Sequence, residues 1–282
     1  MVKIAGVVIV YYPDIDQLLY NISSYINHVD RLFVVFNSPV SIEETERLIS
    51  CYPQLQIILN GYNSGIAVVL NQTAEKAMNL GYEWLLTMDQ DSRFQSENFF
   101  NSCIMANHQN AAIFSPNHEL KVEVEGVTAL LSDEVLSVIT SGNLLNLKIW
   151  KELNGFEEKL FIDEVDHDYC LKAVSHGFKV IRFRYIPLSH ELGEPKEVRL
   201  LFKRYFYHLH PPVRSYYIFR NNFYIFKKYK KLFPEFINFR KRVLLKDFIK
   251  LMLFSPERMS NIRYIYHGLR DYAFGQYGPL QD

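Results

Sequence analysis

The sequence of 282 residues predicts an α/β fold, in which helices flank a mostly parallel sheet and a helical C-terminal region follows. Two observations support this prediction. Short runs rich in Val and Ile alternate four times with segments of helical spacing, and the links between them are short. Such alternation is typical of βαβ units with right-handed crossovers. The composition, 49% hydrophobic and 22% charged, agrees with a folded globular chain.

The first half of the chain carries the clearest elements. Each expected strand is a short apolar run bounded by polar or turn residues, and the four lie at 3–12, 31–36, 55–59 and 84–88. Helices are expected between them at 14–26, 41–51 and 65–80. Asp14 is suited to cap the first helix, and Ser41 with Glu44 fits a capping box at the second.

The pattern after residue 91 is less regular. Helices are expected at 95–109, 145–153 and 168–176, and strands at 111–115, 121–131 and 179–184. From Leu200 the composition becomes aromatic and basic, and helix is expected there. The chain is therefore expected to divide into a sheet domain at 1–195 and a helical region at 196–282.

Charge is segregated along this chain, although the net charge is zero. Residues 196–250 hold 15 Lys and Arg against 3 Asp and Glu, whereas residues 1–195 hold 13 against 25. Such asymmetry suggests a polyanionic partner. Phe, Leu and Ile interleave with the basic residues, which favours an anionic membrane surface; a solvated helix is the default alternative. Nucleic acid is disfavoured, because the acidic body would repel it and no nucleic-acid motif occurs.

Cysteine usage and the N-terminus bear on the compartment. The odd number of cysteines (Cys51, Cys103 and Cys170) lacks metal-ligand spacing and indicates reduced thiols in a cytosolic protein. Charge and Pro13 follow the first apolar run at once, which favours a strand over a signal peptide. No run approaches the roughly 20 apolar residues that span a bilayer. We therefore expect a cytoplasmic protein.

Two carboxylates, Asp89 and Asp91, follow the strand expected at 84–88. Ligands of open α/β sheets bind beyond the carboxyl ends of the strands. Paired carboxylates there can hold a hard divalent cation, which in turn can hold a diphosphate. The same spacing recurs at Asp14/Asp16 and Asp166/Asp168, so a solvated turn or a helix cap is the alternative for any one copy.

A second acidic cluster places four acids within six residues, at Asp163, Glu164, Asp166 and Asp168. Asp168 is interpreted as a helix cap, which a carboxylate suits because of the free N–H groups and the helix dipole. Four acids exceed what a cap requires. Asp166 is therefore a candidate general base, able to take a proton from an acceptor hydroxyl.

Three further features have both a functional and a structural interpretation. His190 follows the late strand and suits either a metal ligand or a surface position. The segment at Asn63 and Gly65, with Asn71, opens a helix and suits either a phosphate site or a plain cap. Arg214 and Arg220 suit either phosphate pairing or an amphipathic helix. The sequence contains no dinucleotide-binding glycine motif and no P-loop, which disfavours dehydrogenases and ATPases.

Taken in order, these motifs resemble a family 2 glycosyltransferase of the GT-A fold, and more narrowly the bacterial rhamnosyltransferase-like branch that builds surface polysaccharides. The resemblance covers nearly the whole chain. It is carried by Val10-Tyr11-Tyr12-Pro13, Asn63-Ser64-Gly65-Ile66-Ala67 with Asn71, Asp89-Gln90-Asp91, Thr140-Ser141-Gly142, the block from Asn154 to Asp163, His190 with Gly193, and Arg214-x-Tyr216-Tyr217-x-x-Arg220-Asn221. One departure is Asn37 after Phe36, where the family usually has an Asp that contacts the nucleotide base.

The resemblance implies an inverting, metal-dependent transferase. Asp166 would be the general base, and Asp91, Asp89 and His190 would hold Mg²⁺ or Mn²⁺. Donor contacts would come from Tyr11, Pro13, Asn37, Asn63, Gly65, Asn71, Asp89, Arg214 and Arg220. Ser141, Gly142 and Asp163 would lie on the acceptor side.

It also implies partners and a location. The donor would be a dTDP- or UDP-sugar, with rhamnose favoured, and the acceptor a saccharide on a lipid carrier. The protein would act peripherally at the inner face of the plasma membrane, with 196–282 contacting the acceptor or the membrane surface; an oligomer is left open. Two other classes remain as alternatives. A nucleotidyltransferase would need a glycine-rich loop after the first strand, which is absent, and a non-catalytic nucleotide-sugar-binding scaffold would lack turnover.

Overall fold

The computed structural model describes residues 3–106, 110–119, 131–190, 196–200, 203–207 and 210–281. Most of the strand expected at 121–131 lies outside these residues. The chain splits into two compact units. One comprises Met1–Glu157 and Asp166–Glu191, and the other Glu158–Val165 and Leu192–Asp282. The short segment Glu158–Val165 thus groups with the C-terminal unit, although the sequence places it in the sheet domain.

The first unit is built on one sheet, whose strands in the described residues are β1 (Ile4–Val10), β2 (Arg31–Phe36), β3 (Leu55–Leu59), β4 (Trp84–Asp89), β5 (Ser92–Phe94), β6 (Ala111–Asn117), β7 (Ser132–Glu134), β8 (Asn143–Asn146) and β9 (Lys179–His190). Their order is β3-β2-β1-β4-β8-β6-β9-β5, with β7 also on β9. β1 pairs in parallel with β2 and β4, as do β2 with β3 and β6 with β9, whereas β5, β7 and β8 run antiparallel to their neighbours. The predicted mostly parallel α/β sheet is confirmed.

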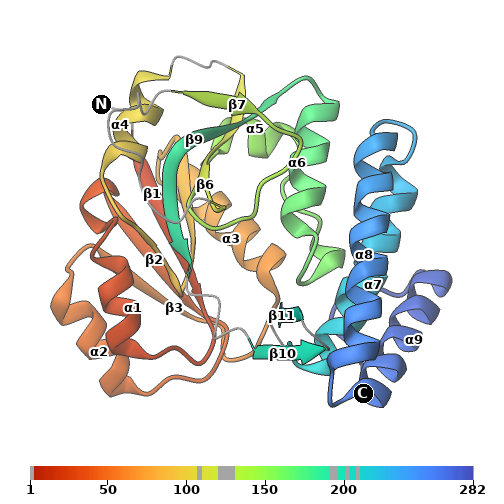
Figure 1. The fold of residues 1–282 in the computed structure, drawn as a ribbon. Helices are drawn as coiled ribbons and strands as arrows, with labels where there is room; N and C mark the ends of the chain where they lie inside the picture. Colours follow the sequence, from red (N-terminus) through yellow and green to blue (C-terminus); the bar gives the residue numbers. More distant parts are fainter. Residues whose placement is uncertain are drawn as a thin grey trace. The chain divides into compact units, whose positions relative to one another are not determined.

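Helices cover both sides of this sheet (Figure 1), and they are α1 (Ile15–Ile22), α2 (Ile42–Cys51), α3 (Ile66–Asn79), α4 (Asn98–Met105), α5 (Leu147–Glu152) and α6 (Val165–Ser175). In this view α1, α2 and α4 lie to the left of the strands, and α3, α5 and α6 to the right. The predicted N-caps are confirmed. Asp14 accepts hydrogen bonds from the N–H groups of Asp16 and Gln17, and Ser41 forms the capping box with Glu44.

The central strands are apolar along their whole length because both of their faces are covered. Every residue of β1 except Ile9 is buried, and all residues of β2 after Arg31 are buried. An aromatic group from β5, α4 and β9 extends this core, through the stacked rings of Phe94 and Phe99 and the edge contact of Phe99 with Phe183. A rigid sheet therefore supports the loops at its edges.

Several boundaries differ from the sequence-based expectation. β5 was not expected, because three residues after an acidic turn carry too little pattern to show a strand. β8 occupies residues 143–146, and the following helix begins at Leu147, capped by Asn146. The helix expected at 168–176 begins earlier, at Val165. Asp168 therefore lies inside α6, and its interpretation as a cap is wrong.

The second unit contains a hairpin, β10 (Lys196–Leu200) with β11 (Lys203–Tyr207), and the helices α7 (Pro212–Tyr229), α8 (Pro234–Phe254) and α9 (Arg258–Phe274). The expected helix from Leu200 is wrong at residues 203–207, where aromatic residues favour strand. α7 begins with Pro212 at its first position, which proline suits. α7 and α9 cross closely, because a side chain at Gly268 would lie 2.5 Å from the carbonyl oxygen of Tyr216.

Length and composition also bear on membrane insertion. In the part of the chain that the structure describes, every helix is too short or too polar to cross a bilayer.

Candidate active site

The carboxyl ends of β1 and β4 form the point where the sheet topology reverses. From β1 the chain proceeds outward to β2 and β3, and α3 then returns it to β4 on the other side of β1. In open α/β sheets, this switch point is where ligands bind. The N–H of Tyr11, just after β1, donates to Oε1 of Gln90 at 2.7 Å. The structure thus brings the predicted Tyr11 and the Asp89–Asp91 motif together.

The Asp89–Asp91 turn is held from several sides. Asp89 is the last residue of β4, and its N–H donates to Oγ of Ser141 at 3.1 Å. The side-chain amide of Asn21, from α1, donates to the carbonyl of Gln90 at 2.8 Å. Asp91 follows in the turn, and β5 begins at Ser92. These hydrogen bonds hold the turn that carries the two carboxylates at the carboxyl end of β4. A metal or phosphate site requires such a rigid support.

The register between β5 and β9 places His190 next to this turn. The backbone of His190 pairs with Ser92, the residue after Asp91. The side chain of His190 lies outside the described residues. Among the side chains that the structure does describe, no group of three or more His, Cys, Asp or Glu could hold a metal ion. Two carboxylates and one imidazole nevertheless suit a hard or borderline divalent cation, so the residues around this turn fit the predicted metal.

A polar network joins the ends of β2 and β3 to the start of α3. Oδ1 of Asn37 accepts hydrogen bonds from Nδ2 of Asn60 at 2.7 Å and from Oγ of Ser64 at 3.2 Å. Oδ1 of Asn63 accepts from the N–H of Gly65 at 3.0 Å. Gly65 caps α3 with φ = 83°, a left-handed conformation that favours glycine. These predicted donor residues share one edge of the sheet, and their contact with a donor stays a prediction.

Asn71 forms hydrogen bonds with Trp150 and Phe156. Its Oδ1 accepts from the N–H of Phe156 at 2.7 Å and from Nε1 of Trp150 at 3.2 Å, and its Nδ2 donates to the carbonyl of Phe156 at 3.0 Å. A side chain at Gly155 would lie 2.5 Å from Oδ1 of Asn71. Asn71 therefore braces the turn that precedes the second acidic cluster, and its contact with a donor stays a prediction.

Ser141 and Gly142 also have structural roles. Ser141 is fully buried, and its hydroxyl accepts the Asp89 N–H, so an acceptor contact of this residue stays a prediction. Gly142 has φ = +77°, and its N–H donates to the carbonyl of Thr87 at 2.7 Å. A Cβ there would meet Leu188 and Pro116 at 2.9 Å. The pair therefore holds the end of β4, and an acceptor contact of Gly142 stays a prediction.

Asp166 lies beside the face of the sheet to which Thr87, on β4, points. With Thr87, Asn143 and Tyr169 it lines a small cavity of about 10 Å³ in the first unit. Side chains at i and i+2 of a strand share a face, so Asp89 points to the face of β4 from which Thr87 reaches the Asp166 cavity. Oδ1 of Asp166 accepts from the N–H of His167 at 2.8 Å, and its side chain is 20% exposed. Asp89 and Asp166 therefore lie on one face of the sheet in the first unit.

The residues that follow Asp166 form a buried, acidic helix start. Asp168 is fully buried. Burial raises the pKa of the Cys170 thiol to about 12, and the carboxylates of Asp166 and Asp168 add to the rise. The pKa of the Tyr169 hydroxyl is also raised by burial. Both groups stay protonated at neutral pH, so neither competes with Asp166 as a base.

The segment before α6, within the second unit, has an unusual backbone. Phe161, Asp163 and Glu164 have φ values of 66°, 62° and 65°. Such left-handed conformations cost a non-glycine residue on the order of 1–2 kcal/mol each, so other contacts must offset them. The carboxylate of Asp163 pairs with Arg214, whose Nη2 lies 2.9 Å from Oδ1. The two predicted residues Asp163 and Arg214 therefore contact each other, and their ligand roles stay predictions.

Arg220 forms hydrogen bonds within the second unit. It is fully buried in the second unit, and Nη1 donates to the carbonyl of Gly278 at 2.7 Å and to the hydroxyl of Tyr216 at 3.1 Å. Nη2 donates to the carbonyl of Leu160 at 3.2 Å. Its guanidinium hydrogen-bonds buried carbonyl groups, which favours a structural role, and the contact of Arg220 with donor phosphate stays a prediction.

Aromatic residues surround the end of β1. Tyr11 is 52% exposed, and its ring contacts the edge of Tyr12 at a centroid distance of 4.7 Å. Pro13 is half-buried next to them. An exposed tyrosine at a switch point offers a face on which a nucleotide base can stack.

Sequence reasoning missed Thr87 and Asn143, the small polar residues inside otherwise apolar runs that line the Asp166 cavity.

Comparisons with known proteins bear on this geometry. No family model matches the chain. The chain is 28% identical over 247 residues to the dTDP-rhamnosyl transferase RfbF of Shigella flexneri, a match that covers 80% of each protein. Its fold is similar to that of GalNAc-T7, solved with UDP, GalNAc and Mn²⁺, with a TM-score of 0.63 and 8% identity over 97% of this chain and 57% of that one.

The chain has the GT-A fold of glycosyltransferases. The resemblance to the rhamnosyltransferase-like branch is confirmed by the similarity to the Shigella flexneri protein. A more distant likeness is to TarS residues 1–349 of S. aureus in complex with UDP-GlcNAc, with a TM-score of 0.49 and 13% identity over 96% of this chain and 73% of that one. The chain spans little more than half the length of the GalNAc-T7 chain.

Proposed function

We propose that the protein is an inverting, metal-dependent glycosyltransferase that moves a sugar, with rhamnose favoured, from a nucleoside diphosphate to a saccharide acceptor. One observation carries the proposal. Asp89, at the switch point between β1 and β4, and Asp166, at the start of α6, lie on the same face of one sheet. In a single displacement, the acceptor hydroxyl attacks the sugar from the side opposite to the leaving group. The general base and the metal ligands must therefore face one shared sugar site.

In this mechanism the donor lies beyond the carboxyl ends of β1 and β4. Tyr11 and Pro13 contact the nucleoside, and the segment at Asn63 and Gly65, supported by Asn37, contacts phosphate oxygens. Asp91, Asp89 and His190 would hold Mg²⁺ or Mn²⁺, which when bound neutralises charge on the departing diphosphate. Asp166 accepts the proton of the acceptor hydroxyl as the bond from the sugar to the phosphate breaks.

The donor class is supported by two relatives. The Shigella flexneri protein is named a dTDP-rhamnosyl transferase, and GalNAc-T7 was solved with UDP and Mn²⁺. We therefore propose a dTDP- or UDP-sugar as donor. A nucleotidyltransferase is the second candidate, but Val10-Tyr11-Tyr12-Pro13 after the first strand contains no glycine-rich loop to grip a triphosphate.

A ligand screen tests this proposal. Melting temperature is measured with dTDP-rhamnose and UDP-sugars, each with and without Mn²⁺. We expect one nucleotide sugar to stabilise the protein only with metal, and Asp91→Ala to remove that stabilisation while the unliganded melting temperature is kept. Slow release of nucleoside diphosphate would distinguish the enzyme from a non-catalytic scaffold. Stabilisation that is equal without metal, or equal in Asp91→Ala, contradicts the metal site.

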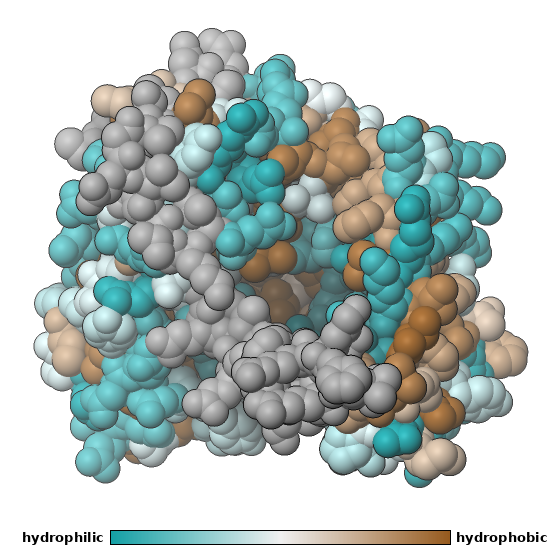
Figure 2. Space-filling model, viewed as in Figure 1, coloured by the Kyte–Doolittle hydropathy of each residue, from teal (hydrophilic) through white to brown (hydrophobic). Residues whose placement is uncertain are grey.

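The proposed acceptor is carried on a lipid, and α8 offers a surface for the membrane. Four large apolar side chains on this helix, Phe239, Leu245, Ile249 and Leu253, are between 47% and 58% exposed. Exposed Arg242, Lys246 and Lys250 lie between them at helical spacing. Figure 2 shows hydrophobic side chains at the surface of the helical unit, at the lower right. A mixed apolar and basic face suits an anionic lipid surface.

Vesicle sedimentation tests the membrane contact separately from activity. The protein should sediment with vesicles that contain phosphatidylglycerol and not with pure phosphatidylcholine. The double variant Lys246→Glu/Ile249→Asp should stay in the supernatant. The matched control is Ile42→Asp, because Ile42 is a 77% exposed apolar residue on α2. Equal sedimentation of the α8 variant and the wild type would contradict this surface.

A further inference from the structure

The strained segment before Asp166 is held by side chains that the proposed mechanism does not use. Phe161, Asp163 and Glu164 all have positive φ. Val165 and Asp166 follow directly in the chain and begin α6. Strain of this kind persists only where surrounding contacts over-determine the backbone, and it is frequent at functional sites. Contacts around this segment must therefore hold the backbone that leads into Asp166.

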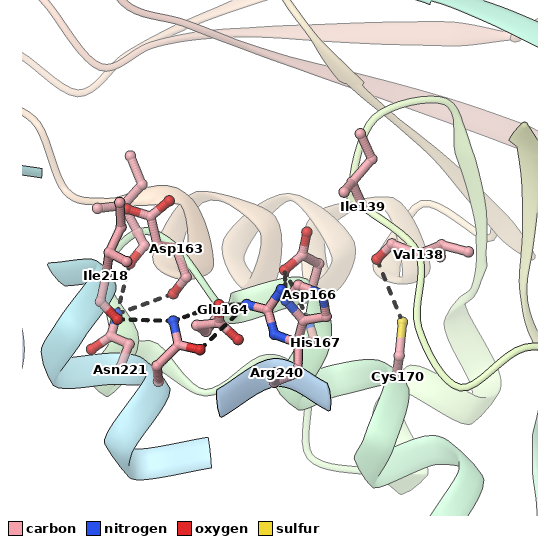
Figure 3. Close-up of polar contacts among 12 residues, drawn as sticks. Val138, Ile139, Asp163, Glu164, Asp166, His167, Cys170, Ile218, Asn221 and Arg240 are labelled. Atoms are coloured by element: carbon pink, nitrogen blue, oxygen red, sulfur yellow. Dashed lines mark hydrogen bonds and ion pairs between the residues drawn. The ribbon is translucent and has the colours of Figure 1, made fainter. Parts of the chain in front are cut away.

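Asn221 makes the densest set of these contacts (Figure 3). Its Nδ2 donates to three backbone carbonyls of the segment, those of Leu160 at 2.8 Å, Ile162 at 2.7 Å and Asp163 at 3.0 Å; Figure 3 shows Asn221 beside Asp163. Its Oδ1 accepts from Nε of Arg220 at 3.0 Å. Asn221 is fully buried. One amide thus binds three carbonyls within residues 160–163, and a buried arginine fixes the orientation of that amide.

A second contact holds Glu164. Its Oε1 accepts from Nδ2 of Asn222 at 2.9 Å and pairs with the guanidinium of Arg240, on α8. Figure 3 shows Glu164 beside Arg240. Glu164 is buried, so this ion pair is poorly screened by solvent. The segment is therefore fixed at Leu160, Ile162 and Asp163 by their carbonyls and at Glu164 by its side chain.

We infer that Asn221 is a positioning residue for the general base: by holding the left-handed segment 160–164 it sets where the chain delivers Asp166. The inference rests on the proposed role of Asp166. It also gives a purpose to the Arg220-Asn221 pair of the family-like motif, whose side chains are both buried. A base displaced by about 1 Å loses about 100-fold in rate, so hydrogen bonds that hold the segment 160–164 affect catalysis without contacting the donor.

The test compares two buried asparagines of the same unit. Asn221→Asp keeps the side-chain shape but removes the amide donor, so the carbonyls of Ile162 and Asp163 lose this hydrogen bond and the carbonyl of Leu160 keeps its bond to Arg220. The control is Asn261→Asp, since Nδ2 of Asn261 donates to Oγ of Ser255 and the carbonyl of Glu257 at 3.0 Å and does not contact the segment. We expect kcat of Asn221→Asp to fall about 100-fold with donor KM and donor affinity within about twofold, and kcat of Asn261→Asp to change little.

Two further variants keep the outcome clear. If Asn221→Asp does not fold, Glu164→Gln decides, because it removes the charge opposite Arg240 but keeps the acceptor for Asn222; its kcat should fall while donor KM holds. Equal kcat values for the Asn221 and Asn261 variants, or an unchanged kcat in Glu164→Gln, would overturn the inference. Asp166→Asn is measured beside them. If it retains the wild-type rate, the proposed base fails; if it alone loses activity, only the positioning role fails.

Discussion

Replacing Arg220 by Lys separates a structural anchor from a phosphate-binding residue. The guanidinium donates to the carbonyls of Gly278 and Leu160, to the Tyr216 hydroxyl and to Oδ1 of Asn221. A lysine ammonium has no planar fork and reaches only part of this set. If two buried acceptors lose their donors, the free energy of unfolding falls by roughly 2–6 kcal/mol. The melting temperature should therefore drop by at least about 5 °C.

The assay is thermal unfolding followed by circular dichroism, together with donor affinity at a temperature where the variant is folded. Arg214→Lys is the matched control, because Arg214 is on the same helix but partly exposed and paired with Asp163. An exposed pair contributes about 1 kcal/mol or less, so its melting temperature should shift far less. An Arg220→Lys protein with an unchanged melting temperature and a donor affinity weakened by tenfold would refute the anchor role and support the phosphate role.

Two other predictions concern the first unit. Gly142→Ala should lower its stability by about 2–4 kcal/mol, because the backbone is left-handed and the new methyl group would meet Leu188 and Pro116 at 2.9 Å; Gly61→Ala, with a similar φ but no atom within 4 Å, should lose only about 1 kcal/mol, and equal losses in chemical denaturation would contradict this. The raised pKa of Cys170, about 12, keeps its thiol protonated at pH 8, so iodoacetamide should label exposed Cys51 first and Cys170 only after unfolding. Mass spectrometry that finds both labelled at the same rate in the native protein would contradict the burial of Cys170.

Strand and helix alternation made the first half of the fold predictable. The runs at β1, β2 and β4 are apolar because helices cover both faces of the sheet (Figure 1), and Asp14 and Ser41 mark their helices through side-chain chemistry that is local in sequence. Elements that depend on distant partners were missed. β5 exists because Ser92 and Phe94 pair with the far end of β9, and nothing in three residues reveals that pairing.

The site follows the same division. Asp89 and Asp91 were predictable because a strand end and its carboxylates are adjacent in sequence. Ser141 and Asn71 were assigned to ligands, but each binds a backbone group far along the chain, Asp89 for the first and Phe156 for the second. Polar residues beside a site serve the ligand or the scaffold, and sequence spacing alone does not separate these two uses. Arg220 is the clearest case, since nothing local in its sequence shows that its guanidinium is buried or that it binds the carbonyls of Gly278 and Leu160.

The transfer rate of Asp166→Asn is the most direct test of the proposal that Asp166 is the general base. Asn fills the same volume and can still accept the N–H of His167, so folding and donor affinity should stay as in the wild type. Loss of the general base should lower the single-turnover rate by roughly 10²–10⁴-fold. A variant that binds donor normally and transfers sugar at the wild-type rate would contradict the assignment of Asp166.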